Sequence, residues 1–252
     1  ARNITEISPP RPREFTVNNP ANGEEIARYP LMGADDVDRA VKRARALFPM
    51  WSKTSFRERR KILLRAASIL AENAEEYAER IARENGKTRL DAMLADLYPV
   101  ADLLKFYGKK GGKFLKPVKV SGSVLLPGRK AYYTFEPKGV VGVISPWNYP
   151  FTLSAGPTIS AIMAGNTVVI KPSSQTTDAG LLVREVLEEA GLPPHVVQVI
   201  RVDDLGILPG APAQDLANRV SQNIRARLVG VLVNATLEDE DAHHGLVAQQ
   251  SE

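Results

Sequence analysis

The 252-residue sequence contains no cysteine. This absence excludes disulfide bonds, thiolate metal sites and a cysteine nucleophile. Only three histidines occur, at positions 195, 243 and 244, so we predict no metal site. No apolar run is long enough to span a membrane, and the Pro/Arg-rich start lacks the apolar core of a signal peptide. We therefore expect a soluble, cytoplasmic protein that has no membrane partner.

The last fifth of the chain lacks residue types that are common elsewhere. No lysine follows Lys171, and no aromatic residue follows Phe151. The net charge of the chain is +4, and its acidic and basic residues are mixed, which argues against a nucleic-acid partner. One domain usually spreads its large apolar anchors more evenly. We therefore predict that residues 201–252 form a poorly ordered tail that is unmatched to the rest of the chain.

Residues 1–115 carry helix signals after a polar, proline-punctuated start. Ser55 and Glu58 form the capping-box pattern that begins a helix. The next helix is predicted over residues 74–85, because Gly86 is suited to end it. A further helix is predicted from Arg89 to Tyr107, ending at Gly108 and kinked or split by Pro99. These signals predict a helical N-terminal region over residues 1–115.

Two different patterns follow the helices. Residues 116–138 alternate in hydrophobicity around Pro127-Gly128, which predicts a β-hairpin arm. In residues 139–200, three apolar runs alternate with two helical segments, each of which is followed by glycine. The runs are VVGVIS at 140–145, TVVIK at 167–171 and VVQVI at 196–200. Helical crossovers enforce parallel pairing. The chain is therefore predicted to be α/β, with a parallel βαβαβ half of a Rossmann-like fold.

Polar side chains follow the first two predicted strands. Because ligands of open α/β sheets bind at the carboxyl ends of the strands, Asn148 and Lys171 are candidates for a site. Asn148 could donate its amide to an oxyanion or cap the helix that follows. Lys171 suits a ribose hydroxyl or a phosphate, or it could be a solvated lysine. Trp147 is expected to fill the core.

The runs GVVGVISPWNYP (139–150) and AGNTVVIKPSSQT (164–176) resemble the aldehyde dehydrogenase superfamily, as does YYTFEPKG (132–139). The resemblance covers about residues 15–200 and is closest to the succinate-semialdehyde dehydrogenase branch. It implies an incomplete aldehyde dehydrogenase fold, in which residues 1–115 are the N-terminal helical part of the cofactor domain and Asn148 is the oxyanion donor. It also implies a cofactor site made by Ile144, Ser145, Pro146, Trp147, Asn148, Lys171, Pro172, Ser173 and Ser174.

Ser174 informs the choice of cofactor within that family. Family members that prefer NAD usually have glutamate at this position, where its carboxylate hydrogen-bonds the 2′-hydroxyl of the ribose. Ser174 lacks the carboxylate that would repel a 2′-phosphate, so the resemblance implies NADP in preference to NAD. A small-molecule aldehyde is the implied substrate. The implied partners are further copies of the chain or a full-length relative, bound through residues 116–138.

Two catalytic features of the family are absent from the sequence. The family's reaction uses a cysteine thiolate to attack the aldehyde, and its general base is the glutamate of a Glu-Leu-Gly-Gly-Lys run. This chain has neither the cysteine nor the run. We therefore expect an N-terminal half, cut short or out of frame after about residue 200, that is inactive alone. The alternative is a non-catalytic nucleotide-binding or hetero-oligomerisation module.

Overall fold

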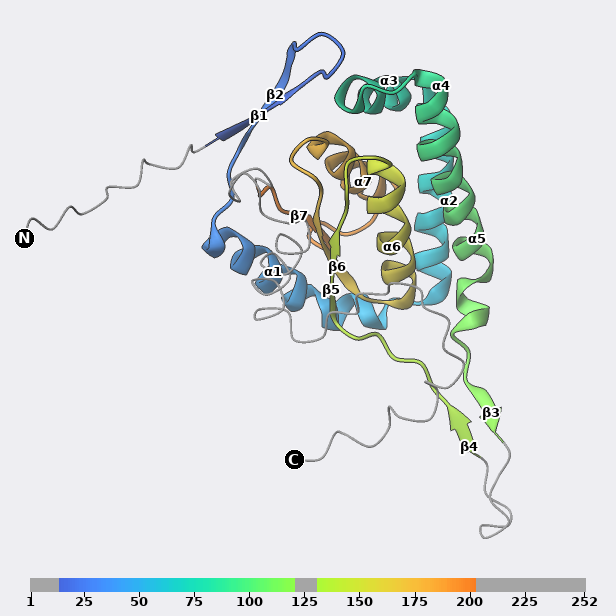
Figure 1. Ribbon diagram of the computed structural model, residues 1–252. Coiled ribbons are helices and arrows are strands. Elements are labelled where there is room, and N and C mark those ends of the chain that lie inside the picture. Colours follow the sequence, from blue (N-terminus) through green and yellow to red (C-terminus); the bar gives the residue numbers. More distant parts are fainter. Residues whose placement is uncertain (1–13, 121–130, 203–252) are drawn as a thin grey trace, which may run out of the picture.

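The computed structural model describes residues 14–120 and 131–202 (Figure 1). The predicted tail, except for its first two residues, and the turn of the predicted hairpin lie outside these ranges. The described chain opens with two antiparallel strands, β1 (Glu14–Asn18) and β2 (Glu25–Pro30). Gly23, between them, has a positive φ of 75°, which glycine adopts without strain.

A helical region follows and agrees closely with the capping signals. Its elements are α1 (Ala34–Lys53), α2 (Phe56–Glu72), α3 (Ala74–Asn85), α4 (Arg89–Asp91), the π-helical turn η1 (Ala92–Leu97) and α5 (Tyr98–Phe114). The Ser55 hydroxyl accepts the Glu58 amide, and the Glu58 carboxylate accepts the Ser55 amide. Gly86 ends α3 in the left-handed conformation. The predicted break near Pro99 takes the form of the π-helical turn.

The prediction that the fourth helix ends at Gly108 is wrong, because α5 continues to Phe114. The glycines of α5 allow close helix packing instead of ending the helix. A Cβ on Gly108 would lie 3.0 Å from Leu64 Cδ2, and one on Gly111 would lie 2.6 Å from Met163 Cγ. The missing side chains therefore let α5 approach both α2 and α6 (Pro150–Ala164).

The centre of the molecule is a three-stranded parallel sheet in the order β5 (Val140–Ile144), β6 (Thr167–Lys171), β7 (Val197–Val199). Helix α6 joins the first pair of strands, and α7 (Thr177–Glu189) joins the second. This confirms the predicted βαβαβ unit. All five residues of β6 are buried, as expected for a central strand covered on both faces.

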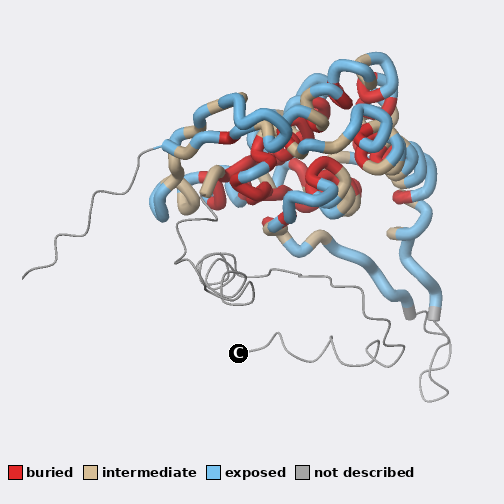
Figure 2. Tube along the Cα trace, turned by 45° about the horizontal axis from the view of Figure 1, so that its top comes forward, coloured by how far each residue is buried: buried red, intermediate tan, exposed pale blue. Residues whose placement is uncertain are grey.

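Helices cover the sheet on both sides, and buried residues concentrate between the layers (Figures 1 and 2). Helix α1 packs on one face, where Ala40, Val41 and Ala44 contact Val140, Val169 and Ile200. Helices α6 and α7 pack on the opposite face and are covered in turn by α2 and α5. The larger core lies on this second side.

Strands β3 (Val118–Val120) and β4 (Ala131–Tyr133) pair antiparallel, with Val118 opposite Tyr133. The paired strands extend away from the body of the molecule (Figure 1). The adjoining chain is mostly exposed (Figure 2). The predicted hairpin arm is therefore present over its described residues.

Candidate functional site

The parallel register brings the two predicted site loops together. Ile144, the last residue of β5, lies beside Lys171, the last residue of β6. The Ser145 amide donates to the Lys171 carbonyl at 3.1 Å, which extends the pairing by one residue. The loops at 145–149 and 172–176 therefore begin side by side at the carboxyl edge of the sheet, where ligands of such folds bind.

The loop after β6 is closely packed. Lys171, Ser173 and Ser174 are only 4%, 6% and 5% exposed. This burial contradicts the interpretation of Lys171 as a solvated lysine. The Ser173 hydroxyl accepts the Gln175 amide at 3.3 Å, and the Ser173 carbonyl accepts the Thr177 hydroxyl at 3.2 Å. The predicted cofactor residues of this loop therefore lie in a fixed local turn, with Pro172 also buried.

The loop after β5 is more exposed. Trp147 is 56% exposed, so the prediction that it fills the core is wrong. The physical reason is that β5 ends at Ile144, and the loop then runs beyond the sheet edge, with Pro146 and Asn148 also exposed. Ser145 is buried, and its hydroxyl forms a 2.6 Å hydrogen bond with Ser154 that ties the loop to α6.

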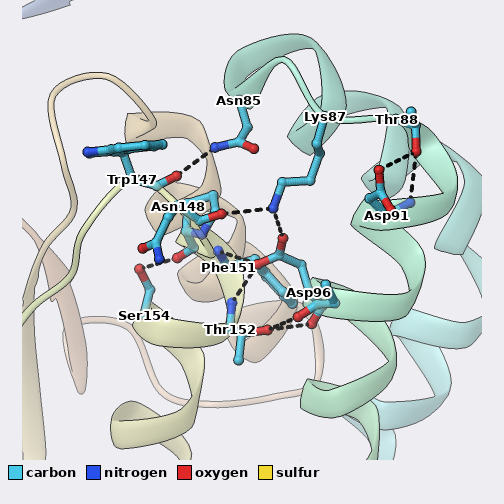
Figure 3. A network of polar contacts seen from close by, with 12 residues as sticks. Asn85, Lys87, Thr88, Asp91, Asp96, Trp147, Asn148, Phe151, Thr152 and Ser154 are labelled. Carbon is cyan, nitrogen blue, oxygen red and sulfur yellow. Dashed lines mark hydrogen bonds and ion pairs between the residues drawn. The ribbon is translucent and has the colours of Figure 1, made fainter.

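Asn148 is not the N-cap residue of α6. Tyr149 occupies that position and makes no side-chain cap. The first amides of α6 are instead bound by Asp96 of η1, whose Oδ1 accepts from Phe151 at 3.2 Å and from Thr152 at 3.1 Å (Figure 3). The helix start is therefore satisfied from a distant segment, and the alternative of an Asn148 cap is not needed.

Asp96 is completely buried and balanced by a cation. Lys87 Nζ lies 2.6 Å from Asp96 Oδ2, and the Lys87 side chain is 11% exposed. The same ammonium donates to the Asn148 carbonyl at 3.0 Å. Nearby, Asn85 Nδ2 donates to the Trp147 carbonyl at 2.6 Å. The segment that connects α3 to η1 therefore contacts the backbone of the loop after β5 (Figure 3).

A second buried acid accepts hydrogen bonds from the first amides of α7. Glu84 of α3 is 4% exposed and accepts the Asp178 amide at 2.8 Å and the Ala179 amide at 3.0 Å. Burial raises the pKa of Glu84 to about 8, although these amides favour the charged form. Arg80 holds Asp178 through two 3.0 Å hydrogen bonds, and these contacts raise the pKa of Arg80.

Glu84, Lys87 and Asp96 are not among the site residues predicted from the sequence. Two of them carried a signal that could have been used. Glu84 follows Tyr77 and Ile81 at helical spacing on the buried face of α3, and Asp96 follows the buried Ala92. An acid on an apolar stripe is rarely buried without a partner, so both positions predicted a specific contact.

Two features are absent from the described chain. Within residues 14–120 and 131–202, no cluster of three or more His, Asp or Glu side chains is placed to hold a metal ion. Within the same ranges, no helix combines the length and hydrophobicity needed to cross a membrane.

The parallel sheet, its covering helices and the two loops at its carboxyl edge define a doubly wound α/β protein. The model of the aldehyde dehydrogenase family matches residues 7–209, so the chain belongs to this family. A 1-pyrroline-5-carboxylate dehydrogenase of Geobacillus thermodenitrificans is 38% identical over 188 residues, which are 74% of this chain and 36% of that protein.

Other similar proteins differ in the substrates and cofactors that their names give. A protein of Mycobacterium ulcerans, named as a succinate-semialdehyde dehydrogenase using NADP(+), is 37% identical over 73% of this chain and 35% of its own length. The structure of a Mycobacterium tuberculosis aldehyde dehydrogenase complexed with NAD+ has a TM-score of 0.71 at 29% identity, covering 76% of this chain and 39% of that one. The chain thus spans little more than a third of the curated relatives that it matches.

Proposed function

We propose that the chain provides the dinucleotide-binding part of an aldehyde dehydrogenase and that it holds NADP at the carboxyl edge of its sheet. The observation that carries this proposal is the burial of Lys171, Ser173 and Ser174 beside the loop that bears Asn148. A buried lysine followed closely by two buried serines suits a ribose hydroxyl or a phosphate. The cofactor would supply the acceptor for hydride, and these side chains would bind and orient it.

The preference for NADP rests on Ser174. A carboxylate at this buried position would repel a 2′-phosphate, whereas a hydroxyl can donate to it. The relative from Mycobacterium ulcerans, whose name gives NADP(+), supports the same choice. We expect NADPH to bind more tightly than NADH in a fluorescence titration, and tighter NADH binding would contradict the proposal.

A substitution that adds a negative charge at position 174 tests the predicted preference for NADP. Ser174→Glu should weaken NADPH binding by about tenfold relative to NADH, roughly the effect of one charged contact. Gln175→Glu is the matched control, because it adds the same charge one residue later at an exposed position. Equal effects of the two substitutions would show that net charge, and not Ser174 itself, determines the preference.

We propose Asn148 as the oxyanion donor of the parent reaction, with succinate semialdehyde as its substrate. Asn148 is exposed at the sheet edge, and its amide does not titrate. A donor of this kind is worth about 3 kcal/mol in comparable sites. Because the 252 residues contain no cysteine, we expect no turnover of succinate semialdehyde by this chain alone with either cofactor. Turnover that Asn148→Ala abolishes would refute this expectation of inactivity.

A second candidate function is pairing with another chain through the β3–β4 arm. The observation that favours it is the exposure of Val118, Tyr132, Tyr133 and Phe135, each 50–53% exposed around an isolated two-stranded ladder. Such apolar surface on an open strand edge favours association. Sedimentation should detect self-association that Tyr133→Ser weakens and Tyr98→Ser, at a 69% exposed site elsewhere, does not. A monodisperse monomer would contradict it.

A further inference from the structure

The chain reversal between α3 and α4 contacts the loop after β5 in a specific way. Asn85 donates to the carbonyl of Trp147, and Lys87 donates to the carbonyl of Asn148 (Figure 3). Both acceptors belong to the backbone. These two bonds therefore hold the path of the loop without using the indole of Trp147 or the amide of Asn148.

Lys87 reaches three groups at once. Its ammonium pairs with Asp96 at 2.6 Å, donates to the Asn148 carbonyl at 3.0 Å and lies 4.9 Å from the centre of the Tyr149 ring. Asp96 Oδ1 in turn binds the first amides of α6. One ion pair thus joins η1 to the loop and to the start of α6, which follow more than fifty residues later in the sequence.

The position of Lys87 is set by the residues on each side of it. Gly86 ends α3 at a φ of 81°, and its amide donates to the Ala82 carbonyl. Thr88 begins α4, and its hydroxyl accepts the Asp91 amide at 3.1 Å. A Cβ on Gly86 would lie 2.6 Å from Pro20 Cγ, so the reversal is also closely packed. Lys87 is therefore held between two helix caps.

The backbone around Asp96 also contacts α6. Pro99 has no N–H, so it cannot bond to the Ala95 carbonyl four residues earlier. The Thr152 hydroxyl donates to the Ala95 carbonyl and to the Asp96 carbonyl, each at 2.9 Å. The start of α6 therefore binds both the side chain and the backbone of η1, and this fixes the Asp96 carboxylate relative to the loop.

We propose that Lys87, paired with Asp96, is a positioning residue for the Trp147–Asn148 loop. It acts through the Asn148 carbonyl and presents the Asn148 amide at the sheet edge. The alternative is that the ion pair only stabilises the packing of η1 against α6. The relevance of the loop to catalysis rests on the function proposed above, but the effect of Lys87 on the loop does not.

The two tryptophans allow the loop to be observed directly. Trp147 is 56% exposed, whereas Trp51 is 1% exposed, so acrylamide quenching reports mainly Trp147. We expect Lys87→Met to increase this quenching and to lower the amplitude of the slow component of the Trp147 anisotropy decay. Lys87→Arg should restore both signals, because it returns a cationic donor. Subtraction of the Trp147→Phe spectrum isolates the loop signal.

Arg89→Met is the matched control for the loss of a cation. Arg89 lies two residues from Lys87, and its pairing with Glu79, at 3.7 Å, is exposed. If Lys87→Met does not fold, Asp96→Asn is the second variant, because it retains an acceptor for the α6 amides and removes the charge that holds Lys87. The proposal would be overturned if the folded variant gave the same quenching and anisotropy of Trp147 as the wild type. It would also be overturned if Arg89→Met changed these signals as much as the loss of the Lys87–Asp96 pair.

Measurements of nucleotide binding distinguish the role of Lys87 from the proposed function. Lys87→Met should weaken NADP binding by about tenfold, on the order of one lost charged hydrogen bond. It should leave binding of adenosine 2′,5′-bisphosphate unchanged, because that fragment is expected to contact only the loop after β6. If the wild-type chain binds neither ligand, the proposed function fails and the Trp147 measurement still decides the role of Lys87. Equal weakening of both ligands would contradict loop positioning.

Discussion

Glu84→Gln should alter stability by an amount that depends on pH. The folded protein keeps Glu84 protonated up to a pKa of about 8, whereas the unfolded chain does so only up to about 4.5. The folded state therefore binds more protons between these values. Stability from Glu84 is complete below about pH 4.5 and is lost as the pH rises to about 8. At 1.36 kcal/mol per pKa unit, the total is up to about 5 kcal/mol.

The prediction decides between two opposing effects at one carboxyl group. Burial favours the neutral form, whereas the amides of Asp178 and Ala179 and the start of α7 favour the charged form. If burial dominates, the free energy of unfolding of the wild type, minus that of Glu84→Gln, should fall by about 3 kcal/mol between pH 5.5 and 7.5. Glutamine does not titrate, so the subtraction removes most other groups.

Urea denaturation at several pH values, followed by circular dichroism, measures this difference. Glu58→Gln is the matched control, since Glu58 also sits at a helix start but is exposed. Hydrogen bonds from Ser55 lower the pKa of Glu58, so its contribution is lost only as the pH falls, and its difference should be flat over the same range. A flat difference for Glu84→Gln, or one that grows with pH, would refute the reasoning.

Two further predictions concern packing. Arg59→Met removes three hydrogen bonds to carbonyls near helix ends and should cost about 3 kcal/mol in urea denaturation, whereas the exposed Arg57→Met should cost under about 0.5 kcal/mol. Gly111→Ala places a methyl 2.6 Å from Met163 and should cost about 1–3 kcal/mol. Gly112→Ala, with its nearest carbon at 3.2 Å, should cost less, and the reverse order would contradict this packing.

The elements that could be predicted from the sequence are those with local causes. The Ser55–Glu58 box and the left-handed Gly86 begin and end helices where their chemistry requires it. Strand β6 matches its apolar run from Thr167 to Lys171. Gly108 shows the limit of this reasoning. The same glycine can end a helix or admit a neighbouring helix, and only the position of Leu64 distinguishes the two.

The candidate site could be predicted only in part for the same reason. Register alone brings Lys171 next to the loop of Asn148, and two consecutive parallel strands suffice to expect that. Trp147 is exposed because its loop runs beyond the sheet edge, and its carbonyl is bound by a residue 62 positions earlier. The apolar stripe indicates that Asp96 has a partner, but no local pattern identifies that partner, or the partner of Lys87, in a segment more than fifty residues away.

The occupied helix starts bear on the dinucleotide binding proposed above. In many Rossmann folds, glycines at the first strand–helix turn let the pyrophosphate approach a helix N-terminus. This chain has no Gly-x-Gly run, and carboxylates of Asp96 and Glu84 already bind the first amides of α6 and α7. A phosphate at either helix start would have to displace a buried acid from the amides that it accepts. In the NADP site proposed above, charge would therefore be recognised by side chains at the strand ends, above all by Lys171.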